Sequence, residues 1–164
     1  LDFYKAVRMN GGSLDIVGKN ADFTGYKLVI IPSFVHFQEE DLQRVIKSGA
    51  QILAGPRTGT KTPGFQLPPE LSLEGLGFQV RRVDALPRDL PVSVEWNGIK
   101  GNFSVWREHG LTSGISEGKA GDDMAVLTSG NQGSYLCGWP DQKLLNAIMK
   151  NQMQLAGLDV VELP

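Results

Sequence analysis

The sequence predicts an α/β domain, a three-layer sandwich in which helices cover a mostly parallel sheet and an antiparallel hairpin is inserted. Two largely apolar runs, Leu28–Ile31 and Gln51–Ala54, flank a helical segment at Glu39–Ser48. Strands that are apolar on both faces are typical of parallel sheets, and the strand–helix–strand order implies a right-handed crossover. Downstream, Asn97-Gly98 separates two apolar segments and is typical of a type I′ hairpin turn.

Hydrophobic periodicity places the first elements in order. Residues 2–10 are predicted to be helical, because Phe3, Ala6 and Val7 recur at the spacing of one helix face. Residues 14–17 are predicted as a short strand. The helix predicted at Glu39–Ser48 carries acidic residues in its first turn, where they interact favourably with the helix dipole.

The middle of the chain is predicted to change from helical to extended structure. A loop rich in Gly, Pro and Thr at 55–69 comes first, followed by a short helical turn at 70–75. Two hairpins follow, at 92–106 and 124–137, because each contains turn residues between apolar segments.

One strong helix closes the chain, at residues 140–156. Its predicted buried stripe contains Leu144, Ile148 and Leu155. Residues 160–161 are predicted to add a short terminal strand.

Composition narrows the class of function. The chain has 164 residues, of which 41% are hydrophobic and 21% charged, as expected for one globular domain. Its formal net charge of -2 argues against general binding to nucleic acid, which requires a basic face. No apolar stretch approaches the roughly 20 residues of a membrane span, so no membrane contact is predicted.

The inventory of cysteine and histidine is small. Cys137 is the single cysteine, which favours a reducing, cytoplasmic location, and its place inside a predicted strand favours a buried structural thiol over a nucleophile. His36 and His109 have no evident partners, and His109 is expected in a turn. The pair Asp122-Asp123 lacks the alternation of a calcium loop, so no metal or cofactor is predicted.

The most conspicuous polar segment is the loop at 55–62, Gly-Pro-Arg-Thr-Gly-Thr-Lys-Thr, which follows a predicted parallel strand. Open α/β sheets bind ligands at this edge. Three interpretations are open: an anion site, an ordered loop that contacts another subunit or domain, and a solvated loop. The contact loop is favoured, because the segment lacks the Gly-Lys-Ser/Thr of a P-loop and Pro56 removes one backbone donor.

The acidic residues do not suggest glycosidase chemistry, which needs two carboxyl groups flanking the scissile bond. They lie at helix starts, such as Glu39 and Glu40, or in expected turns, such as Asp84 and Asp89. No catalytic residue is therefore predicted in this chain.

Four segments, in an order and spacing that cover almost the whole chain, resemble the trimerisation domain of family 42 β-galactosidases. The segments are residues 12–32, with Gly25-Tyr26-Lys27-Leu28-Val29 ahead of an apolar strand, the loop 55–62, Leu76-Gly77-Phe78 with 83–86, and residues 133–138.

The resemblance implies a flavodoxin-like, mostly parallel fold similar to class I glutamine amidotransferases. In those enzymes a catalytic cysteine occupies the turn after the strand that corresponds to Gln51–Ala54, whereas this turn holds Gly55, Pro56 and Arg57. The resemblance therefore implies no amidotransferase activity. It places the family's two catalytic glutamates in an upstream (β/α)8 barrel, outside this chain.

The chain begins with Leu1 and runs directly into a helical segment, which predicts a single domain, residues 1–164, excised from a larger polypeptide. The family domain normally begins with a central strand before that helix. An α/β sheet without this strand would expose apolar edges, so we expect neighbouring residues of the full protein to supply it.

The implied function is that of a non-catalytic oligomerisation domain, which holds a β-galactosidase in a ring-like homotrimer. The parent enzyme would remove terminal β-D-galactosyl residues with retention of configuration. Arginine and aromatic side chains are typical interface anchors, and core packing is the alternative for the aromatics. The candidate contact residues are Arg57, Thr58, Lys61, Trp96, Phe103 and Trp106.

Two functions of other classes are kept as alternatives. One is an amidotransferase-like domain that senses a small molecule at the edge of its sheet, and the other is an enzyme of unrecognised chemistry.

Overall fold

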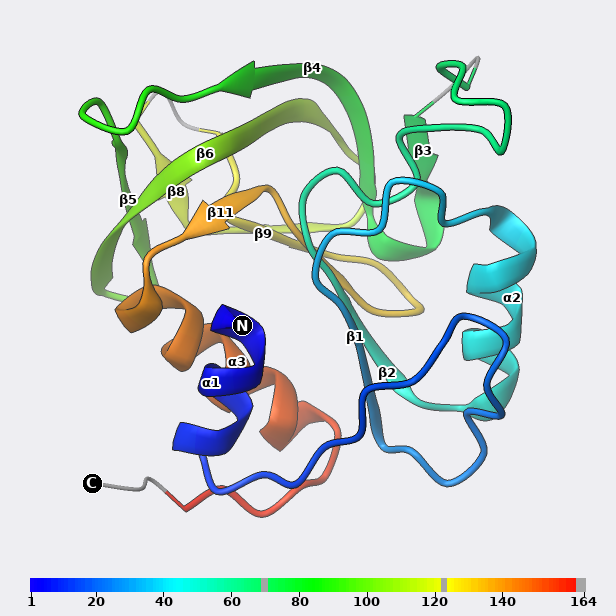
Figure 1. The fold of residues 1–164 in the computed structure, drawn as a ribbon. Helices are drawn as coiled ribbons and strands as arrows, with labels where there is room; N and C mark the ends of the chain where they lie inside the picture. The colour runs from blue at the N-terminus through cyan, green and yellow to red at the C-terminus, as the bar shows by residue number, and fades with distance from the viewer. Residues whose placement is uncertain (69–70, 122–123, 162–164) are drawn as a thin grey trace.

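The computed structural model describes residues 1–68, 71–121 and 124–161 and confirms the predicted α/β class (Figure 1). The described chain forms two sheets and three helices. The helices agree with the predicted ones to within two residues, because local periodicity and capping determine where each begins and ends. They are α1 (Asp2–Met9), α2 (Glu39–Ser48) and α3 (Gln142–Leu155).

The last helix begins later than predicted. Pro140 belongs to a strand, and Asp141 caps the helix, with its Oδ1 accepting a hydrogen bond from the backbone N–H of Leu144 at 2.9 Å. Leu144 and Ile148 are fully buried, but Leu155 is 63% exposed, so the predicted stripe is wrong at that position. None of the described helices has the length and apolarity needed to cross a membrane.

The first sheet has five strands in the order β1-β2-β10-β9-β7. β1, β2 and β10 are parallel, and β9 and β7 extend the sheet in antiparallel orientation. The predicted β-α-β unit and the second predicted hairpin both lie in this sheet. Its strands are β1 (Leu28–Ile31), β2 (Gln51–Ala54), β7 (Ile115–Glu117), β9 (Leu127–Ser129) and β10 (Ser134–Leu136).

Helices cover both faces of the parallel part of this sheet. Leu53 of β2 belongs to an apolar cluster that includes Phe3 of α1 and the buried side of α3. Its neighbours Ile52 and Ala54 belong to a second cluster with Leu42 of α2, because successive strand residues point to opposite faces. In Figure 1, α1 and α3 accordingly lie on one side of β1 and β2, and α2 lies on the other.

The second sheet is antiparallel throughout and bends across one end of the first (Figure 1). Its order is β3-β4-β6-β5-β8, and β11 pairs with the long strand β6. A 3₁₀ turn, η1 (Glu74–Leu76), precedes β4. The strands are β3 (Leu71–Leu73), β4 (Phe78–Ala85), β5 (Val92–Trp96), β6 (Ile99–Thr112), β8 (Lys119–Ala120) and β11 (Gly138–Pro140).

The prediction of a mostly parallel, flavodoxin-like sheet is therefore wrong. Parallel neighbours need crossover connections, usually helical, whereas residues 78–112 run through short connections and pair as antiparallel neighbours. The segment predicted as a hairpin insertion contributes most of a second sheet.

One extended segment joins the two sheets. β10 pairs with β2 and β9 in the first sheet, and β11 pairs with β6 in the second. Cys137 lies between them, with its amide donating to the carbonyl oxygen of Val126 at 3.0 Å. The chain therefore passes directly from the first sheet into the second, and side chains of both sheets pack in one apolar cluster.

Two short predicted strands are wrong. Residues 14–17 and 160–161 are not in strands, and the amide of Val161 instead donates to the carbonyl oxygen of Asn10 at 3.2 Å. Of the predicted helical turn at 70–75, Glu70 lies outside the described residues, and β3 and η1 occupy the remainder.

Candidate functional site

The loop at 55–62 begins where β2 ends, at the carboxyl end of the parallel strands. Gly55 leaves β2 directly beside the chain that leaves β1, and a Cβ atom here would lie 1.9 Å from the carbonyl oxygen of Pro32. Only glycine fits at this distance, so the two loops start side by side. This is the edge where open α/β sheets bind ligands.

Several backbone amides and side-chain hydroxyls of this loop are used within the chain. The amide of Arg57 donates to Oε1 of Glu108 at 3.1 Å, and those of Gly59 and Lys61 donate to carbonyl oxygens of the β1–α2 connection at 3.0 and 2.8 Å. The Thr58 hydroxyl donates to a carbonyl oxygen of its own turn at 2.8 Å. An anion cradle needs amides that point outward, so this geometry favours an ordered loop over an anion site.

Arg57 has a left-handed backbone conformation, with a φ of 70°, which residues other than glycine rarely adopt. Its guanidinium lies over the ring of Trp106, with Cζ 5.2 Å from the ring centroid, in a cation–π arrangement. Both side chains are partly exposed. Within the described part of the chain, the guanidinium has no hydrogen-bond acceptor and no ion-pair partner.

Glu108 holds the Arg57 turn from the interior. Its side chain is 1% exposed, and its carboxyl accepts hydrogen bonds from the Arg57 amide and from the hydroxyl of the buried Tyr135. Burial raises the pKa of Glu108, and the Tyr135 hydroxyl and the Arg57 amide and charge oppose the shift. Burial and the charge of Glu108 raise the pKa of Tyr135 well above its usual value, so this hydroxyl remains a donor.

A β-bulge in β6 directly precedes Trp106. Val105 has a φ of 65°, which β-branched residues rarely adopt, and the pairing of β6 with β11 shifts register here. Two residues in left-handed conformation therefore lie at this place: Arg57, a member of the stacked pair, and Val105, which directly precedes Trp106. Because strained backbone clusters at binding and catalytic sites, this part of the surface is the strongest candidate for a functional site.

The predicted contact residues fall into two groups. Trp96 and Phe103 are 3% and 0% exposed and pack in the core with α3, so core packing, the alternative interpretation, describes both. Thr58 is 3% exposed and also points inward. The residues that retain exposed surface are Arg57, Lys61 and Trp106.

Cys137 is a buried structural thiol, as predicted. It is 1% exposed, and burial together with the charge of Glu108 raises its pKa well above the usual value, so the reactive thiolate is disfavoured. His36 also has a structural environment, because its Nδ1 lies 3.2 Å from the carbonyl oxygen of Thr62 and its ring meets that of Phe65 edge-on.

His109 lies in β6 and not in a turn, and the structure reveals its partner. Its Nε2 lies 2.6 Å from Oδ2 of Asp84, which is in β4 and also not in a turn. Burial alone would raise the pKa of Asp84, but the hydrogen bonds and charges of His109 and Arg82 outweigh burial and lower it. Among the described residues, no three His, Cys, Asp or Glu side chains gather as a metal site, and Asp122 and Asp123 lie outside those residues.

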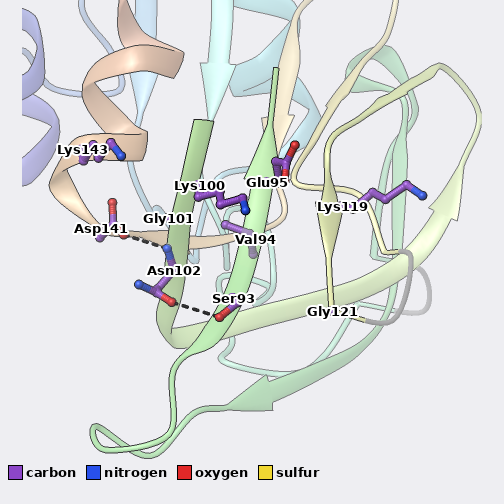
Figure 2. A pocket seen from close by; sticks show the side chains of 10 residues that line it. All are labelled: Ser93, Val94, Glu95, Lys100, Gly101, Asn102, Lys119, Gly121, Asp141 and Lys143. Carbon is purple, nitrogen blue, oxygen red and sulfur yellow. Dashed lines mark hydrogen bonds between the residues drawn. The ribbon is translucent and has the colours of Figure 1, made fainter. Parts of the chain in front are cut away.

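A hollow of about 710 Å³ lies beside β5, β6, β8 and the start of α3 (Figure 2). Glu95 lies opposite Lys100 on one neighbouring strand and Lys119 on the other, so charges of opposite sign alternate along the wall. Both carboxyl oxygens of Asp141 accept backbone amides, from Asn102 at 2.7 Å and from the first turn of α3. Among the described residues that line this hollow, there is therefore neither a pair of free carboxylates nor a uniform charge.

Sequence reasoning missed Glu108. Strand alternation starting from the buried Phe103 places residues 105 and 107 inward and 108 outward. At the bulge β6 advances three residues, from Ser104 to Arg107, while β11 advances one, and both Arg107 and Glu108 are buried, so regular alternation does not hold here. The alternating pattern alone therefore contains no signal for this residue.

Residues 1–158 match the family model described as the beta-galactosidase trimerisation domain. The chain belongs to this family. This trimerisation domain is 36% identical over 169 residues to the beta-galactosidase BgaA of Thermus sp and 28% identical over 176 residues to the beta-galactosidase BgaH of Haloferax lucentense. The two alignments include 99% and 98% of this chain but only 26% of each relative, so the chain spans about a quarter of the length of these relatives.

Solved structures agree with this assignment. The beta-galactosidase from the psychrophilic Marinomonas ef1 matches 99% of this trimerisation domain with a TM-score of 0.92 and 33% identity, over 26% of that chain. The enzyme from the haloarchaeon Halorubrum lacusprofundi matches 99% with a TM-score of 0.86 and 27% identity, over 27% of that chain. The resemblance predicted from the sequence is confirmed.

Proposed function

We propose that this domain holds the subunits of a β-galactosidase together as a homotrimer. The match of residues 1–158 to the trimerisation domain family carries the proposal. Relatives that the chain matches over nearly its whole length are named beta-galactosidases, and it spans about a quarter of them. In this proposal residues 1–164 are one domain of a longer polypeptide, and an upstream (β/α)8 barrel carries the two catalytic glutamates.

Cleavage of the substrate is assigned to the barrel. A retaining glycosidase needs two carboxyl groups roughly 5 Å apart beside the scissile bond. In the described part of this domain, three carboxyl groups are held by hydrogen bonds within the chain: Glu108 by Tyr135 and a backbone amide, Asp84 by His109, and Asp141 by two amides. This supports a domain that assembles subunits, while the parent enzyme removes terminal β-D-galactosyl residues in the cytoplasm.

The proposed contact surface lies on the loop after β2 and the bulge of β6. Arg57, Lys61 and Trp106 are its polar and aromatic members, and Phe65 and Leu67 of the same loop are 73% and 68% exposed. Large apolar side chains exposed on the same loop as an arginine that stacks on tryptophan are typical of protein interfaces.

Light scattering on the complete polypeptide tests the proposal. We expect a mass of three chains, and a monomer once residues 1–164 are removed. Hydrolysis of a nitrophenyl β-galactoside, measured in parallel, should occur with the complete polypeptide and not with residues 1–164 alone. A monomeric complete polypeptide, a trimer that survives the deletion, or hydrolysis by the isolated domain would overturn it.

A further inference from the structure

We propose that the Arg57 guanidinium, stacked on Trp106, is the receptor for a carboxylate side chain of a neighbouring copy of this domain. The inference rests on the proposed homotrimer and extends it, because it names the group that makes the contact and the chemistry that the group recognises.

The guanidinium has unused hydrogen-bonding capacity. It carries five N–H donors in a planar fork, and within the described chain none of them has an acceptor. The guanidinium lies over the ring of Trp106, with Cζ 5.2 Å from the centroid, and the Arg57 residue remains partly exposed. A carboxylate matches such a fork with two parallel hydrogen bonds, and a fork that is already oriented loses less entropy on binding.

The backbone at Arg57 would suit glycine better than arginine. Its φ of 70° lies in the left-handed region, where a side chain is unfavourable. The buried Glu108 nevertheless holds this turn by accepting the Arg57 amide at 3.1 Å. Within the described chain the guanidinium lies over Trp106 and its charge acts on Glu108, but its N–H donors have no acceptor there, and a partner carboxylate would supply one.

The surroundings favour a protein carboxylate over a small free anion. The amides of Arg57, Gly59 and Lys61 are used inside the chain, so the loop offers no cradle that would surround a free anion. The guanidinium lies instead over the ring of Trp106, whose neighbour in the chain, Val105, is 45% exposed. An arginine beside an apolar surface is typical of interface anchors, and in a closed ring each subunit presents this anchor to a different surface of the next.

Arg57→Gly in the complete polypeptide is the decisive variant. It gives the left-handed position the residue that it favours but also removes a guanidinium that stacks on Trp106 and acts on Glu108, so we expect an unfolding temperature close to that of the wild type when both proteins are dilute enough to be monomeric. Sedimentation velocity over a dilution series should show the dissociation constant of the trimer raised at least tenfold. Arg57→Lys, which keeps the charge but not the planar fork, should raise it by a smaller factor. Arg88→Gly, at an exposed arginine, is the matched control and should leave assembly unchanged.

The outcomes separate this inference from the proposed function. A wild-type trimer with an unchanged dissociation constant in Arg57→Gly would overturn the inference and leave the proposed function standing. A wild-type monomer would overturn both. If Arg57→Gly lowers both the unfolding temperature and assembly, Arg57→Lys decides: weaker assembly at the wild-type unfolding temperature supports the inference, and unchanged assembly overturns it.

Discussion

Glu108 connects the protein interior to the exposed loop at the scale of single residues. Its carboxyl group is removed from water and has two hydrogen-bond donors, the Arg57 amide and the Tyr135 hydroxyl. Two such bonds only partly replace the hydration that a carboxylate loses on burial, which is why burial dominates and raises the pKa of Glu108. The conformation of the loop is therefore linked to a titratable group that solvent does not reach.

Glu108→Gln should remove one pH-dependent contribution to stability. Because the pKa of Glu108 is raised on folding, the native state binds this proton more tightly than the unfolded chain. The contribution of Glu108 to the free energy of unfolding therefore increases as the pH falls from 7 towards about 4.5, near the ordinary value for glutamate. We therefore expect the difference between the two free energies of unfolding, wild type minus Glu108→Gln, to increase as the pH is lowered from 7 to about 4.5.

Denaturant titrations of both proteins at several pH values measure this difference. Groups common to the two proteins cancel, including Asp84, whose lowered pKa acts in the opposite direction and removes stability as the pH falls. A difference that stays constant, or that shrinks on acidification, would contradict the assignment of Glu108.

At the scale of elements, the close approach of β1 and β2 determines where the candidate site lies. The chain leaves β2 through Gly55, against the carbonyl oxygen of Pro32. This neighbour is backbone in the middle of the fold, so it cannot move aside as the end of a flexible side chain would.

Gly55→Ala should destabilise the domain by about 3 kcal/mol, the upper end of the range for overpacking. The added methyl group would meet the Pro32 oxygen at 1.9 Å, which forces the two strand ends apart. Gly18→Ala is the matched control, because a Cβ atom there meets nothing within 4 Å, and it should change stability by less than about 0.5 kcal/mol. Equal unfolding midpoints for the two variants in urea would show that the strand ends are not packed as described.

The elements also show what the sequence can and cannot predict. The three helices and the β1–α2–β2 unit are predictable, because their signals lie within a few residues of one another. The pairing of β4 with β6 joins residues far apart in sequence, such as Phe78 and Thr112, and local patterns do not encode that register. The hairpin predicted at 92–106 forms, with β5 paired to β6 across Asn97-Gly98, but the larger antiparallel sheet around it lies beyond the reach of local patterns.

The same limit applies to the candidate site. Arg57 and Lys61 were predicted as contact residues from their position after a parallel strand, a rule that depends only on local order. Trp96 and Phe103 were included for being aromatic, and only the packing of the second sheet on α3 shows that they are core residues. The burial of Glu108 could not be predicted, because the bulge between Ser104 and Arg107 interrupts the regular alternation of inward and outward side chains.

At the scale of the whole molecule, the two sheets share one apolar core, so we expect them to unfold as one cooperative unit. The segment from β10 to β11 passes from one sheet into the other, and a single apolar cluster contains Leu53 and Leu136 of the first sheet with Phe103 of the second. Neither sheet can lose its packing without exposing the side chains of the other. A contact surface that combines the loop after β2 with the bulge of β6 is therefore held by both sheets at once.

The three tryptophans and the single thiol of the chain allow this cooperativity to be measured. Trp96, Trp106 and Trp139 all lie in the second sheet, whereas Cys137 is buried where the sheets meet. We expect tryptophan fluorescence, far-UV circular dichroism and thiol reactivity to give the same midpoint in urea, as for a two-state transition. Gly138→Ala, which would place a methyl group 2.4 Å from the ring of Phe103, should lower all three midpoints equally. A fluorescence transition that moves while the thiol stays protected would mean that the second sheet unfolds by itself, and that the contact surface is not built on one unit.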